Sequence, residues 1–88
     1  MDHYLSKTGS PKLFGLIVEY MRHTQKIIFK NERRGIDQFY YDFDYKGEEY
    51  SLHLEHYLGI MIISNSKNQA IKILVNEIIT DVIITFIK

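Results

Sequence analysis

Apolar and polar residues alternate through the segment FYYDFDYKGEEYSLHLEH, which runs from Phe39 to His56. With Lys46-Gly47 as a two-residue turn, one face pairs only apolar or aromatic residues: Phe43 with Tyr50, Tyr41 with Leu52 and Phe39 with Leu54. The other face pairs mostly polar residues: Asp44 with Glu49, Asp42 with Ser51, Tyr40 with His53 and Gln38 with Glu55. A slip of one residue would turn every side chain to the opposite face. The pattern therefore predicts a β-hairpin with a core face and an open face, and a longer turn over 45–48 would keep the same register.

A helical pattern begins at Ser10-Pro11, where serine caps the first free amides and proline fits the first helical position. Apolar residues then recur at helical spacing on one stripe: Leu13, Phe14, Ile17, Tyr20 and Met21. Gly15 weakens this helix by about 1 kcal/mol relative to alanine. We interpret it as a sign that another backbone approaches closely there.

Three further segments complete the pattern. Residues 25–31 alternate as a strand does, and the apolar run 60–63 predicts a strand that is covered on both faces. From about Lys67 to Phe86, a helical stripe predicts a closing helix through Ile71, Leu74, Val75, Ile78, Ile79, Val82 and Phe86. Residues 80–87 are rich in Ile, Val and Thr, so a strand stays an alternative there.

The predicted order is α-β-β-β-β-α. Short connections make neighbouring strands antiparallel, which predicts an α+β two-layer sandwich. Its sheet is a four-stranded antiparallel meander with both helices on one face. Residues 1–9 are polar and are predicted to be a flexible lead-in to a single domain over 10–88. Several small bacterial domains share this order of elements, and the likeness is one of architecture alone.

Composition narrows the functional classes. The chain has 88 residues, no cysteine, and 11 basic and 11 acidic side chains, so its formal net charge is zero. Disulfides and cysteine-ligated metals are excluded. Residues 1–9 lack the apolar core of a secretory signal. Charged residues interrupt the apolar stretch 71–87, and each costs about 2.5–3.5 kcal/mol at bilayer depth. We therefore expect a cytoplasmic protein without a membrane span.

The open face of the hairpin holds the first set of candidate residues: Tyr40, Asp42, Asp44, Glu49, His53 and Glu55. Asp44 opposite Glu49 is a like-charge pair, which is unfavourable unless a cation or a basic partner lies nearby. The face is interpreted as a solvated surface, a protein interface, or a weak metal or acid–base site at Asp42, His53 and Glu55. Because no second histidine shares their side of the strand, no metal is predicted.

The closing helix carries more isoleucine than a single core stripe needs: Ile73, Ile83, Ile84 and Ile87. Three of these fall along one flank, and Ile83 falls on the far side. A helix this apolar is usually covered on more than one side, and a chain with one sheet layer has little to cover it with. The surplus predicts a symmetric homodimer or another protein partner, with coverage by a loop as the alternative.

Basic side chains gather near the end of the first helix and the turn after the first strand: Arg22, Lys26, Lys30, Arg33 and Arg34. Together with Tyr40 on the sheet, they raise the alternative of nucleic-acid binding. The zero net charge and the acidic group on the adjacent strands oppose it.

Catalysis has little support. The chain has no cysteine, its glycines are isolated rather than grouped in a phosphate loop, and its serines fall in turns, the N-terminal tail or the open face. We therefore expect no cofactor and no enzymatic activity. The expected function is a small protein-interaction module, a regulator, inhibitor or immunity-type binder, that acts as a homodimer. The alternative is an accessory protein that binds nucleic acid.

Overall fold

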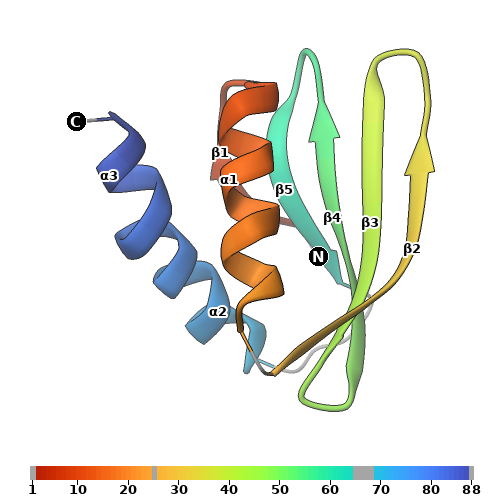
Figure 1. Cartoon of the computed structure of the whole chain (residues 1–88), viewed down its shortest axis with the longest axis vertical. Helices are drawn as coiled ribbons and strands as arrows, with labels where there is room; N and C mark the ends of the chain where they lie inside the picture. The colour runs from red at the N-terminus through yellow and green to blue at the C-terminus, as the bar shows by residue number, and fades with distance from the viewer. Residues whose placement is uncertain (1, 25, 65–68, 88) are drawn as a thin grey trace.

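The sheet has five antiparallel strands in the order β1-β5-β4-β3-β2, as the computed structural model describes residues 2–24, 26–64 and 69–87 (Figure 1). The elements are β1 (Asp2–Ser6), α1 (Pro11–Arg22), β2 (Ile27–Arg34), β3 (Gln38–Tyr45), β4 (Glu48–Glu55), β5 (Gly59–Ser64), α2 (Ile71–Ile78), η1 (Ile79–Ile83) and α3 (Ile84–Ile87). The predicted four-stranded meander is confirmed as β2-β3-β4-β5 within an α+β fold.

Residues 2–6, which were predicted to belong to a flexible lead-in, form strand β1 of the sheet, so that prediction is wrong for them. β1 pairs antiparallel with β5, with His3 opposite Ile62 and Tyr4 opposite Met61. The side chain of Leu5 joins the core. The physical reason is that β5 would otherwise be an edge strand with a free row of amides and carbonyls. A short polar segment completes that edge mainly through its backbone.

The hairpin register predicted from the sequence is confirmed along its length. β3 and β4 pair with Phe43 opposite Tyr50, Tyr41 opposite Leu52 and Tyr40 opposite His53. Lys46 and Gly47 form the turn with φ values of 51° and 79°. Both values are left-handed, as a two-residue hairpin turn that follows the twist of the strands requires.

α1 begins where the sequence predicts it. The Ser10 side chain accepts a hydrogen bond from the backbone amide of Leu13 at 3.2 Å, and Pro11 opens the first turn. The stripe that includes Ile17 and Met21 is buried against the sheet. The cap and the apolar stripe together explain why this segment is helical.

The C-terminal helix is confirmed over the described residues 71–87, and the strand alternative for residues 80–87 is wrong. The predicted start near Lys67 lies outside the described residues. The helix contains a π turn at η1, where the amide of Ile84 donates to the carbonyl of Ile79, five residues earlier. This extra residue rotates the following positions by about 100°. As a result Ile83 is buried and Phe86 is 38% exposed, the reverse of the predicted arrangement.

Both helical segments pack on the core face of the sheet, and no helix of the described residues covers its open face. Figure 1 shows α2, η1 and α3 beside α1, at the end of the sheet that carries β1. Of the described helices, only α1 therefore lies near the β2 edge. None of the described helices is long and apolar enough to cross a membrane.

Candidate functional site

The predicted residues of the open sheet face come together as expected, and β2 supplies them with basic partners. Lys30 Nζ lies 3.0 Å from Asp44 Oδ2 and 3.4 Å from Glu49 Oε2. The like-charge pair of Asp44 and Glu49 is therefore bridged by a lysine of the same chain. A cation from outside is not needed to relieve the repulsion between the two carboxylates.

A second group on this face links Arg33, Asp42, Ser51 and His53. Arg33 Nη2 donates to Asp42 Oδ1 at 2.9 Å, and Ser51 Oγ donates to the same oxygen at 2.9 Å. Since the single hydroxyl proton of Ser51 goes to Asp42, His53 Nε2, 2.9 Å from Ser51 Oγ, acts as the donor. Burial lowers the pKa of His53, and the carboxylate of Glu55 acts in the opposite direction. The group is a chain of satisfied hydrogen bonds.

The Tyr40 ring contacts two members of this hydrogen-bonded group, His53 and Arg33. The rings of Tyr40 and His53 lie 4.2 Å apart, and the guanidinium of Arg33 lies 5.1 Å from the Tyr40 ring. The Tyr40 hydroxyl donates to Gln38. Within residues 2–24, 26–64 and 69–87, no group of three histidine or acidic side chains is placed to hold a metal ion. At the weak alternative site of Asp42, His53 and Glu55, the Asp42 oxygen Oδ1 already accepts hydrogen bonds from Arg33 and Ser51.

The basic residues predicted for nucleic-acid binding do not form one surface. Lys30 and Arg33 lie on the open face and pair with its acids. Arg34 lies on the helix side, where its Nη2 is 2.7 Å from Glu32 Oε1. Lys26 is exposed just before β2. The sheet separates these cations, and most of their charge is already matched within the chain.

The isoleucines predicted for a helix interface divide into two groups. Ile73 and Ile84 are 51% and 44% exposed, in agreement with an outer position, whereas Ile83 belongs to the core. The π turn between Ile73 and Ile84 breaks the flank on which they were predicted to align. The Ile87 side chain lies outside the described part of the structure.

Sequence reasoning missed a second apolar surface, which we call the helix-layer patch: Leu16 of α1 with Val82, Thr85 and Phe86 of the C-terminal helix, and Asp81 at its rim. These residues line a hollow of about 390 Å³. Leu16 is 44% exposed. The Asp81 carboxylate accepts a hydrogen bond from the Tyr20 hydroxyl at 2.7 Å, and this bond, with burial, raises the pKa of Tyr20 to about 12. The sequence did not mark this patch, since Leu16 falls beside the apolar stripe of α1 and an α-helical register places Phe86 in the core.

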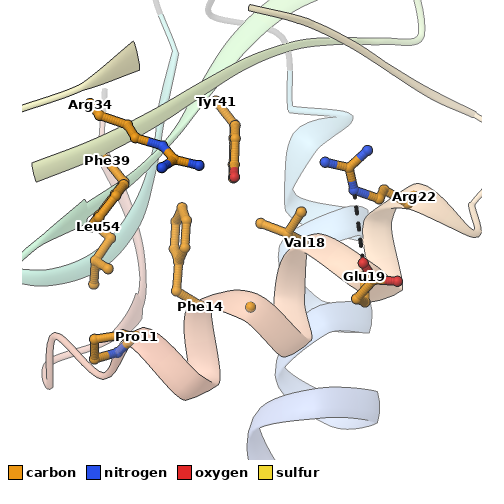
Figure 2. A pocket seen from close by; sticks show the side chains of 10 residues that line it. Pro11, Phe14, Val18, Glu19, Arg22, Arg34, Phe39, Tyr41 and Leu54 are labelled. Atoms are coloured by element: carbon orange, nitrogen blue, oxygen red, sulfur yellow. Dashed lines mark ion pairs between the residues drawn. The ribbon is translucent and has the colours of Figure 1, made fainter. Parts of the chain in front are cut away.

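A second missed feature is the α1–β3 groove, a hollow of about 330 Å³ on the helix side of the β2 edge. The groove is lined by residues of α1 and of the strands beside it: Pro11, Phe14, Gly15, Val18, Glu19, Arg22, Arg34, Phe39, Tyr41 and Leu54. Figure 2 shows the aromatic side chains facing one another, with Arg34 entering from β2 and Arg22 from α1. No linear motif marks this groove because its walls come from segments about 20 residues apart in the chain.

The chain matches no family model, no curated protein and no solved structure. A functional assignment therefore depends on the chemistry of these surfaces.

Proposed function

We propose that this chain is a small non-enzymatic protein-interaction module that acts as a homodimer, in the manner of a regulator, inhibitor or immunity-type binder. The observation that carries the proposal is the helix-layer patch. There a leucine and a phenylalanine are substantially exposed beside a hollow lined by Val82 and Thr85. Paired apolar side chains around a recess are typical of a contact surface.

A second copy of the chain is the occupant that this patch favours. A two-fold interface uses the same surface on both subunits, so the surface must offer both a projecting group and a recess. The helix-layer patch has both, because Phe86 is 38% exposed and also lines the hollow. Its only acid, Asp81, is held by Tyr20, so two copies do not bring free carboxylates together.

The energetics support an association that is reversible on dilution. Full burial of a leucine or phenylalanine contributes about 1.5–3 kcal/mol. Leu16 and Phe86 are about half exposed, so two copies together supply on the order of 3–6 kcal/mol from these side chains before association costs. Dissociation in the micromolar range corresponds to about 8 kcal/mol net of association costs, so neighbouring exposed residues such as Ile84 must supply a large part of the buried area.

The other surfaces are less favourable for the dimer contact. Five charged residues of the open face are paired with one another: Lys30, Arg33, Asp42, Asp44 and Glu49. Burying that network would remove water from these charges with little new attraction. Nucleic-acid binding is disfavoured for a related reason, because Lys30, Arg33 and Arg34 already have acidic partners.

The test is the solution mass of the full chain over a range of micromolar concentrations, measured by light scattering after size exclusion. The wild-type protein should approach twice the mass of one chain as the concentration rises. Phe86→Asp places an unpaired charge in the contact and should keep the mass at that of one chain, with an unchanged circular dichroism spectrum. Leu16→Asp should do the same from the neighbouring helix.

Ile36→Asp is the matched control because Ile36 is fully exposed in the β2–β3 turn, away from the helix layer. It introduces the same charge and should leave the dimer intact. A wild-type protein that stays monomeric throughout, or a Phe86→Asp variant that dimerises like the wild type, would refute the proposal.

A further inference from the structure

No close contact within the described chain requires glycine at position 15. A side chain built there would meet no atom within 4 Å, so the expected close approach of another backbone is absent among the described residues. Glycine nevertheless occupies the middle of α1, where most residues would favour the helix more strongly. Gly15 lies on the wall of the α1–β3 groove, and because it has no side chain the groove stays open beside the helix backbone.

The remaining wall of the groove is aromatic. Phe14 and Tyr41 stack with ring centroids 5.5 Å apart and an interplanar angle of 12°. Phe39 lies 6.4 Å from Phe14 and extends this surface. Tyr41 and Phe39 stay only partly buried because the C-terminal helix packs toward β1 instead. A flat apolar ligand would gain ring contacts here that water does not provide.

Arg22 supplies a cation at the rim, and its ion pair with Glu19, which also lines the groove, is long (Figure 2). Its closest approach to Glu19 is 4.0 Å, which is beyond hydrogen-bonding distance, and its guanidinium lies 5.4 Å from the centre of the Phe29 ring. Arg34, by contrast, directs Nε and Nη2 to a single oxygen of Glu32, at 2.9 and 2.7 Å. The groove thus has one arginine neutralised by Glu32 and one held against a ring with donors available.

From this arrangement we infer that the α1–β3 groove binds a small aromatic carboxylate. The aromatic body lies against Phe14 and Tyr41 over Gly15, and the carboxylate accepts hydrogen bonds from Arg22. The groove volume of about 330 Å³ is at the lower end of the range for small-molecule sites, which suits a ligand of one or two rings. The inference is independent of the proposed homodimer, since the helix-layer patch uses a different side of α1.

The test is a titration of the isotopically labelled full chain with naphthylacetate, followed by nuclear magnetic resonance. The backbone amide of Gly15 and the side-chain Nε–H of Arg22 should shift together in a saturable manner. The neutral naphthylacetamide should bind about tenfold more weakly because it loses the charge-assisted hydrogen bonds. Arg22→Gln should weaken naphthylacetate binding by a similar factor and abolish the preference for the carboxylate.

Two pairs of variants separate binding from folding. Gly15→Leu should abolish binding by filling the groove while its melting temperature stays at or above that of the wild type, since leucine favours the helix. Gly15→Ala adds one methyl group and should retain most of the affinity. Lys12→Gln removes a charge from α1 outside the groove and should bind like the wild type.

The inference is overturned if no resonance shifts at millimolar ligand, if the shifts centre on other residues, or if the amide binds as tightly as the carboxylate. Unchanged affinity in Gly15→Leu would overturn it as well. Repeating the titration on Phe86→Asp keeps the two proposals apart, because groove binding should survive loss of the helix-layer contact.

Discussion

The open sheet face and the helix layer differ in how their side chains are satisfied. On the open face, Arg33, Asp42, Ser51 and His53 form a hydrogen-bonded chain in which each polar group has a partner from the same molecule. In the helix layer, Leu16 remains exposed with only a hollow beside it. The polar side chains of this group are therefore satisfied within the molecule, whereas the exposed apolar side chain of Leu16 still lacks a packing partner.

This difference indicates where a partner gains most. Exposed ion pairs contribute about 0–1 kcal/mol each and are screened by salt, so a partner that displaces them gains little. Exposed apolar area is removed from water on contact at about 25 cal/mol per Å², largely independent of salt. A surface rich in polar groups is easily noticed in a sequence, yet the apolar surface is the better candidate for binding.

The largest expected effect concerns adjacent isoleucines in the helix layer. Ile83→Ala should lower the free energy of unfolding by about 2–5 kcal/mol, because Ile83 is 6% exposed and its loss leaves a cavity. Ile84→Ala should change it by about 0.5 kcal/mol or less, as an exposed position does. Urea denaturation followed by circular dichroism measures both. An uninterrupted α-helix would leave both isoleucines outside the core stripe, so two small effects of similar size would contradict the π turn.

A smaller effect is expected at the polar link between α1 and η1. Tyr20→Phe should cost about 1 kcal/mol at neutral pH, since it removes the hydrogen bond to Asp81. The bond stabilises the protonated phenol and raises the pKa of Tyr20 from about 10 to about 12. Its contribution is therefore fully present below pH 10 and is lost as the pH rises toward 12.

The measurement is the difference in unfolding free energy between the wild type and Tyr20→Phe as a function of pH. Taking the difference cancels the alkaline titration of the other tyrosines. A difference that is already absent at neutral pH, or that grows above pH 10, would show that the helix layer does not depend on this bond.

The smallest effect is expected on the open face. Arg33→Gln should lower the free energy of unfolding by about 0.2–1 kcal/mol at low salt, through the loss of its bond to Asp42, and the difference should shrink in molar salt. Lys26→Gln is the control, because none of the described residues forms an ion pair with Lys26. A large, salt-independent effect of Arg33→Gln would mean that the open face is structurally as important as the helix layer.

The candidate surfaces could be predicted from the sequence only in part. Alternation alone predicts the hairpin register, so the sequence places Asp42, Asp44, Glu49 and His53 on one face. The sequence alone groups their partners Lys30 and Arg33 with other basic residues, because only the pairing of β2 with β3, with its bulge between Phe29 and Asn31, puts them beside these acids. Both missed surfaces, the helix-layer patch and the α1–β3 groove, combine residues from distant segments.

The sequence alone determined what depends on neighbours along the chain: the capped start of α1 at Ser10, the Lys46-Gly47 turn with its register, and the antiparallel meander. Each is governed by local backbone preference or by side-chain periodicity. Only the tertiary structure decided that residues 2–6 form β1, because that strand exists through pairing with β5. Only the tertiary structure decided that Ile83 enters the core while Phe86 leaves it. The π turn inserts one residue into the helix and so changes which later side chains face the core. The spacing of apolar residues in the sequence does not predict this insertion.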